Sequence, residues 1–125
     1  MWLNKSKIVK KNRETSLNFI VKELDINSKE YWDEIIQITF ISDENYIAIS
    51  RLSYQDEIYF EFNDQTNFIY AYYKDITFLL EENILSVYIL NNIKRSVDVD
   101  SIIIDLNNCN LSQITKAIEY LKMNV

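Results

Sequence analysis

The sequence predicts an α+β fold: a twisted antiparallel β-sheet meander of about six strands with a C-terminal amphipathic helix packed on it. Short segments along most of the chain alternate apolar and polar residues or are rich in β-branched and aromatic residues, a pattern typical of strands. Short polar connections join these segments, and antiparallel neighbours need no more than that. Near the end the apolar residues change from a period of two to the period of a helix.

The first half of the chain supplies four predicted strands. The last of them alternates most regularly, with Ile58, Phe60 and Phe62 on one face and Glu57, Tyr59 and Glu61 on the other. Such alternation indicates a strand with one buried face and one wet face. The four segments are "SLNFIVKEL" (16–24), "IIQITFI" (35–41), "YIAISRL" (46–52) and "DEIYFEF" (56–62).

The second half is predicted to begin with a turn at "NDQTN" (63–67). Asparagine and aspartate tolerate left-handed backbone angles better than other residues that have a Cβ, so this segment can reverse the chain without glycine. A long central strand is expected over 68–80, followed by strands over 84–90 and 101–106.

The C-terminal segment predicts a helix over 111–123. Leu111, Ile114, Ile118 and Leu121 recur at helical spacing, and Asn110 precedes the first turn as a capping residue. We expect this apolar stripe to pack against the sheet face that bears Ile58, Phe60 and Phe62.

Length and composition predict a single domain over 1–125. The chain is 48% hydrophobic, which is enough apolar area to form an ordered core. Its apolar runs are too short to span a membrane. The start of the chain has basic residues but lacks the apolar stretch of a secretory signal, so we expect a cytoplasmic protein that does not bind a membrane.

Three residue types that support much enzyme chemistry are scarce or missing. The chain has no histidine, no glycine and a single cysteine, Cys109. Histidine-dependent triads, imidazole or cysteine zinc sites and glycine-rich phosphate loops are thereby excluded. We expect no cofactor, no metal and no enzymatic activity, although two carboxylates at the right separation would still suffice for a hydrolase.

Charge is distributed unevenly along the chain. Residues 1–14 form a basic N-terminal segment with a net charge of +4, so the remaining residues have a net charge of −10. Phosphate backbones repel an acidic body, which argues against nucleic acid as a partner. Complementary fields instead favour a basic protein as the partner.

Acidic residues gather in three places. The clusters are Asp56, Glu57 and Glu61; Asp98, Asp100 and Asp105; and Asp43 with Glu44. None follows a known metal-binding pattern such as the calcium loop with its glycine, so we expect solvated acids. Cys109 lies just before the predicted helix, and a lone cysteine in that place is more often a small apolar residue than a nucleophile.

Aromatic residues are concentrated in "YFEFNDQTNFIYAYY" (59–73). We expect Phe60, Phe62 and Phe78 to lie in the core. The tyrosines can leave a hydroxyl in water while the ring contacts another protein. The predicted partner-binding residues are Glu57, Tyr59, Glu61, Tyr70 and Tyr72, and the other interpretation is an ordinary sheet surface.

From residue 43 to residue 125 the sequence resembles the immunity protein 10 family of bacterial polymorphic-toxin immunity proteins. The resemblance rests on "NYIAISR", "YFEFNDQTN", "YAYYKDITF", "LSVYIL" and "SIIIDLN" before a short helix. It implies a cytoplasmic protein that binds and neutralises the catalytic domain of a cognate toxin and has no catalytic residues of its own. Two alternatives stay open: a general protein-interaction or adaptor domain, monomeric or homodimeric, and a carboxylate-dependent hydrolase or small-ligand carrier.

Overall fold

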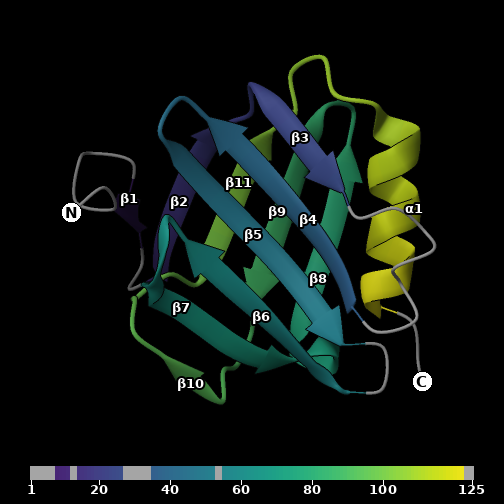
Figure 1. Cartoon of the computed structure of the whole chain (residues 1–125). Coiled ribbons are helices and arrows are strands. Elements are labelled where there is room, and N and C mark those ends of the chain that lie inside the picture. The colour runs from purple at the N-terminus through teal and green to yellow at the C-terminus, as the bar shows by residue number, and fades with distance from the viewer. Residues whose placement is uncertain (1–7, 12–13, 27–34, 53–54, 123–125) are drawn as a thin grey trace.

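The computed structural model describes residues 8–11, 14–26, 35–52 and 55–122 of the chain (Figure 1). In these residues the strands form two sheets that lie face to face, with a helix at one side (Figure 1). The back sheet has the order β1 (Ile8–Lys11), β2 (Glu14–Ile20), β11 (Ser101–Asp105), β9 (Ile84–Ile89) and β8 (Ile76–Glu81). The front sheet has the order β10 (Lys94–Arg95), β7 (Asp64–Tyr72), β6 (Glu57–Phe62), β5 (Asn45–Leu52), β4 (Ile35–Ser42) and β3 (Glu23–Ile26).

The predicted α+β class, with a largely antiparallel sheet and a C-terminal helix, is confirmed. The front sheet is antiparallel throughout its described strands. Two features differ from the expected single meander: the strands divide between two sheets, and β11 pairs with β2 in parallel. The expected basic segment contains β1, which pairs with β2.

The first predicted strand, 16–24, is broken where the chain passes from one sheet to the other. The backbone N–H of Val21 donates to the carbonyl of Asp105 in the back sheet at 2.9 Å. The next N–H, that of Lys22, donates to the carbonyl of Ile41 in the front sheet at 2.8 Å. The backbone thus exchanges partners between consecutive residues at a corner that separates β2 from β3. Lys22 and Glu23 are both exposed there, so the alternation changes phase between Val21 and Leu24.

The predicted long strand over 68–80 is wrong for the same physical reason. A 3₁₀ turn, η3 (Tyr73–Asp75), separates β7 of the front sheet from β8 of the back sheet. The N–H of Tyr73 still donates to Asp56, whereas the carbonyl of Asp75 accepts from Leu90 beyond β9. Tyr73 and Ile76 are both buried at this corner, and the charged Lys74 and Asp75 between them mark the place where the alternation changes phase.

The reversal between β6 and β7 is tighter than predicted. Asn63 alone takes the left-handed conformation, with φ of 68°, while 64–67 already belong to β7. The partner of β6 changes from Phe68 to Asp64 as β6 advances from Glu61 to Phe62, which marks a bulge. The other described residues with positive φ are Asp43, Glu82 and Asn107, so no glycine is needed at these bends.

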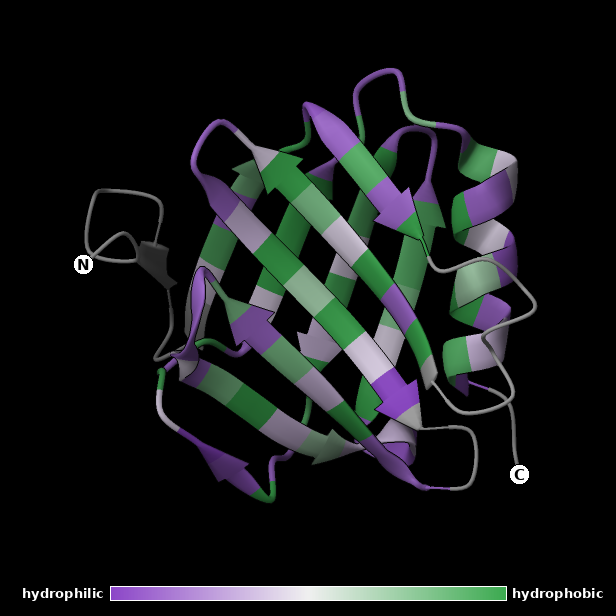
Figure 2. Ribbon diagram, viewed as in Figure 1, coloured by the Kyte–Doolittle hydropathy of each residue, from purple (hydrophilic) through white to green (hydrophobic). Residues whose placement is uncertain are grey.

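One hydrophobic core fills the space between the sheets. Ile58, Phe60 and Phe62 are fully buried, as their alternation predicts, and Figure 2 shows the same alternation along the strands at the front. Phe78 is half-buried and packs against the core. The back sheet contributes mainly Leu17, Phe19, Leu85, Val87, Ile89, Ile102 and Ile104.

Helix α1 (Leu111–Lys122) begins where the sequence predicts. The side-chain oxygen of Asn110 accepts from the N–H groups of Ser112 and Gln113 at 3.0 and 3.2 Å. The helix stands beside the sandwich and contacts β4 and η3 (Figure 1). The predicted packing of the helix flat on the face that bears Ile58, Phe60 and Phe62 is therefore wrong, because the back sheet covers that face. Its buried residues are Ile114, Ala117 and Leu121, whereas Ile118 is half-buried and Leu111 is exposed. No helix among the described residues is long and apolar enough to cross a membrane.

Candidate functional site

The five predicted partner-binding residues lie together on the outer face of the front sheet. Antiparallel pairing sets Glu57 of β6 opposite Tyr72 of β7, and Tyr59 opposite Tyr70. Glu61 follows on the same side of β6, opposite Phe68. The alternation in this strand buries the phenylalanines and leaves these side chains outside.

The aromatic residues of this face touch one another. The ring centroids of Tyr59 and Tyr70 are 4.8 Å apart, and those of Phe68 and Tyr70 are 5.6 Å apart, in tilted and edge-on arrangements. Tyr70 is 37% exposed and Tyr72 is 49% exposed. Rings that pack on each other while part of their surface stays in water form a rigid apolar patch at low entropic cost.

Glu61 joins two strands through its carboxylate. Its Oε1 accepts from the hydroxyl of Tyr59 at 2.7 Å, and its Oε2 accepts from the hydroxyl of Tyr46 on β5. Burial and the hydrogen bond to Glu61 raise the pKa of Tyr46 to about 12. The same two causes raise the pKa of Tyr59. Both phenols therefore remain neutral donors at ordinary pH and fix the position of the carboxylate.

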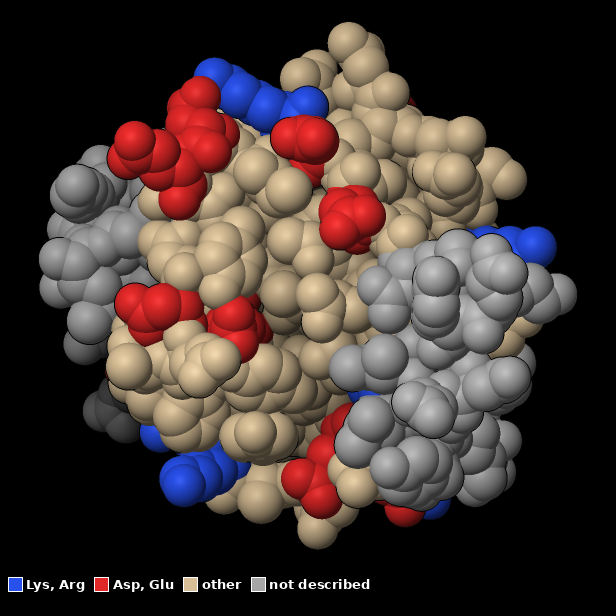
Figure 3. Space-filling view, viewed as in Figure 1, with Lys and Arg blue, Asp and Glu red and all other residues tan. Residues whose placement is uncertain are grey.

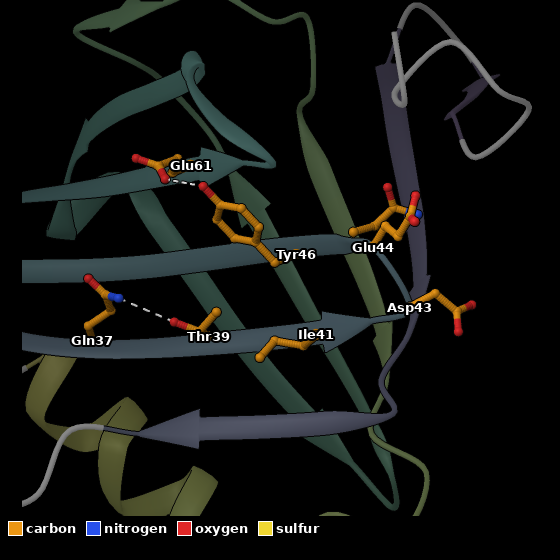
Figure 4. Close-up of a pocket in the computed structure, with 8 residues that line it drawn as sticks. Gln37, Thr39, Ile41, Asp43, Glu44, Tyr46 and Glu61 are labelled. Carbon is orange, nitrogen blue, oxygen red and sulfur yellow. Dashed lines mark hydrogen bonds between the residues drawn. The ribbon is translucent and has the colours of Figure 1, made fainter.

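Two hollows lie on either side of Glu61. The first, the acidic hollow, has a volume of about 380 Å³ and is shown in Figure 4. Its side chains project from β4 and β5, with Gln37 donating to Thr39 at 3.2 Å and the Tyr46 ring on the side nearest Glu61 (Figure 4). The acidic hollow is lined by Gln37, Thr39, Ile41, Asp43, Glu44, Asn45, Tyr46 and Glu61.

The second, the aromatic hollow, has a volume of about 450 Å³. It lies over β6, β7 and β10, and Lys94 of β10 is the basic residue in its lining. The Nζ of Lys94 is 5.8 Å from the centroid of the Phe68 ring, within the range of a cation–π contact. The aromatic hollow is lined by Tyr59, Glu61, Gln65, Phe68, Tyr70 and Lys94.

Acidic residues line both hollows: Asp43, Glu44 and Glu61 the acidic hollow, and Glu61 the aromatic hollow. Figure 3 shows acidic side chains grouped along the left and the top of this face, with basic side chains at its margins. Lys22 is already paired with Asp43, with 2.7 Å between the charged atoms. The face therefore presents rings between carboxylates, an arrangement that complements a basic surface.

The other acidic clusters do not form sites in the described part of the chain. Asp98 and Asp100 both pair with Arg95 at 3.1 Å, while Asp105 accepts from Asn83 and from the N–H of Asn107. No group of acids and cysteine among the described residues could hold a metal ion. Burial raises the pKa of Cys109, and its side chain packs against the core, so the thiolate is not favoured.

Sequence reasoning missed Tyr46, Phe68 and Lys94. Tyr46 belongs to the strand predicted over 46–52. Because Ile47 and Ile49 are buried and successive side chains alternate between the two faces, the side chain of Tyr46 lies on the outer face. Phe68 is the first residue of the strand predicted over 68–80, and its side chain lies on the outer face opposite Glu61. No local signal could identify Lys94, because its strand has two residues.

The chain matches no protein-family model, no curated protein and no solved structure.

Proposed function

We propose that this protein is an immunity protein that binds and neutralises a cognate bacterial polymorphic toxin in the cytoplasm of the producing cell. The single observation behind the proposal is the cluster in which Tyr46 and Tyr59 hold Glu61 between them, beside the exposed rings of Tyr70 and Tyr72. The resemblance to the immunity protein 10 family supports the same role.

The cluster has the physical properties of a binding surface for a basic protein. Half-exposed tyrosines supply contact area with few rotatable bonds, and tyrosine is common among the residues that dominate binding energy. Carboxylates around them steer a positively charged partner and speed its association. A protein that covers the active site of the toxin inhibits it without any catalytic residue of its own.

The alternative of a homodimer through this same face is less favourable. Two copies would bring Glu57, Glu61 and Asp64 of one chain toward the same acids of the other. Like charges across an interface cost free energy unless a base separates them, and the whole chain already has a net charge of −6. A partner of opposite charge fits the face better.

The proposal predicts that the gene immediately upstream encodes the toxin domain, and binding to that gene's product tests it. The two purified proteins should form a stoichiometric complex in which the toxin's activity is abolished. Glu57→Lys should mainly slow association and reduce its salt dependence, and Tyr72→Ala should mainly speed dissociation. The matched controls are Glu119→Lys on α1 and Tyr88→Ala on β9, which are exposed residues away from this face.

The results distinguish an error in the proposed function from an error in the assigned binding face. A toxin domain that neither binds nor loses activity would overturn the proposed function. Inhibition that persists with unaltered rates in Glu57→Lys and Tyr72→Ala would leave the function standing and exclude this face as its site.

A further inference from the structure

We infer that the aromatic hollow receives an arginine side chain of the partner, and that Lys94 occupies this position in the free protein. The inference rests on the proposed function, because the arginine would belong to the basic toxin domain. It adds the chemical group that the surface recognises and a residue of this chain that competes with it.

The lining of the hollow suits a cation. The ring centroid of Tyr70 is 4.8 Å from that of Tyr59 and 5.6 Å from that of Phe68. Aromatic faces attract a cation through the ring quadrupole. The Glu61 carboxylate closes one side of the same hollow. A neutral or anionic group would leave this carboxylate without a charged partner.

Arginine fits the carboxylate better than lysine does. Each oxygen of Glu61 accepts one phenolic hydrogen, and a carboxylate oxygen has a second lone pair available. The two oxygens can thus accept a bidentate pair of N–H groups from one guanidinium. The guanidinium plane also stacks on aromatic rings, whereas an ammonium is a more strongly hydrated point charge.

Lys94 already shows that the hollow accommodates a positive charge. Its Nζ is 5.8 Å from the Phe68 ring centroid, and its backbone is held in place beside Tyr70. Hydrogen bonds from Ile93 to Tyr70 and from Ser96 to Phe68 flank it on β7. The side chain itself is exposed, so it can swing into solvent when another cation arrives, and until then its charge opposes entry.

The test compares Lys94→Gln with Lys116→Gln. Both substitutions remove one positive charge from an exposed side chain, so the change in net charge is matched, but Lys116 lies on α1 away from the hollow. Lys94→Gln should lower the Kd for the upstream toxin domain by about 3- to 10-fold, and Lys116→Gln should leave it within about twofold. Equal effects of the two substitutions would overturn the inference.

A small probe tests the hollow without the toxin. Nα-acetyl-argininamide is titrated into the free protein, and ring proton signals of Tyr59, Phe68 and Tyr70 are followed by NMR. We expect saturable shifts at about millimolar concentration, larger in Lys94→Gln, and none with the neutral citrulline analogue. Equal shifts with the citrulline analogue, or stronger binding of the lysine analogue, would overturn the assignment to arginine. If the arginine probe shifts the ring signals but the toxin domain does not bind, the proposed function is wrong and the aromatic hollow is still an arginine site.

Discussion

The guanidinium of Arg51 lies over the ring of Tyr73, with its Cζ 4.2 Å from the ring centroid. Arg51 comes from β5 and is 3% exposed, and Tyr73 begins the 3₁₀ turn at which the chain leaves the front sheet. The same guanidinium donates to the carbonyl of Leu121 near the end of α1 at 2.7 Å, and its Nε donates to the carbonyl of Gln55 at 2.8 Å. One side chain thus connects a hairpin, a corner and the helix.

Replacing Arg51 should destabilise the fold. Arg51→Met keeps much of the volume but leaves the Leu121 and Gln55 carbonyls without this donor and removes the cation–π contact, a loss of about 2–4 kcal/mol in the free energy of unfolding. The ion pair of Arg51 with Asp56 adds little to this loss, because 3.9 Å separates Nη2 of Arg51 from Oδ1 of Asp56. Urea denaturation measures the change. Arg95→Met, which breaks exposed ion pairs, is the control and should cost less than about 1 kcal/mol.

Charge introduced at Ile114 should have a larger effect than charge at Ile118. Ile114 is fully buried and Ile118 is half-buried, so Ile114→Asp places an unpaired carboxylate in the core, at a cost of more than about 3 kcal/mol. Thermal unfolding of both variants, with the exposed Thr115→Asp as the control, measures the order. A lower melting temperature for Ile118→Asp than for Ile114→Asp would contradict the helix orientation.

The left-handed bend between β8 and β9 should accept glycine. Glu82 has φ of 54°, a conformation that costs a residue with a Cβ about 1–2 kcal/mol. Glycine relieves that strain and adds less than about 1 kcal/mol of backbone entropy, so Glu82→Gly should raise the free energy of unfolding by up to about 1 kcal/mol. Asn63→Gly should instead lower it, because the Asn63 side chain accepts from the N–H of Tyr46 at 2.8 Å. Chemical denaturation of the two variants should therefore give opposite signs.

Tyr46 should make stability fall at high pH. Its pKa is raised from 10.0 to about 12 in the folded state, so the unfolded chain loses the phenolic proton first as pH rises. The associated stabilisation is complete below about pH 10 and is lost as pH approaches 12. Denaturation at a series of pH values should show a shallower decline over this interval for Tyr46→Phe. Tyr88→Phe is the control. A decline in Tyr46→Phe identical to that of the unsubstituted protein would show that neither burial nor the hydrogen bond to Glu61 raises the pKa of Tyr46.

Periodicity predicted the strands and the helix but not the division into two sheets. Alternation reports which side chains of a strand are buried. Each of the two sheets buries one of its faces in the same core, so the pattern looks alike in both. At Val21 and Lys22 the hydrogen-bond partners change from β11 to β4. The alternation changes phase there, which marks a bend in the chain but does not say that the next strand joins another sheet. Over 73–76 the charged Lys74 and Asp75 stand between the buried Tyr73 and Ile76, a break in the alternation that a single strand over 68–80 does not account for.

The candidate surface was predictable where it depends on a single strand and its neighbour. Glu57, Tyr59 and Glu61 follow from alternation in β6, and their meeting with Tyr70 and Tyr72 follows from a hairpin. The contribution of Tyr46 depends on how β5 pairs with β6, and that of Lys94 depends on a two-residue strand that returns from the far side of β9. Contacts between distant segments leave no periodic trace in a sequence.

The parallel pairing of β2 with β11 has a consequence for how the chain folds during synthesis. Leu17 pairs with Ile102, so a strand made near the start must wait for one made near the end. The front-sheet hairpins from β4 to β7 connect sequence neighbours and can form while the ribosome is still translating the rest. We expect the closing of the back sheet to limit the folding rate, since contacts between distant residues form slowly. Until the back sheet closes, the apolar inner faces of the strands are exposed to water and can aggregate.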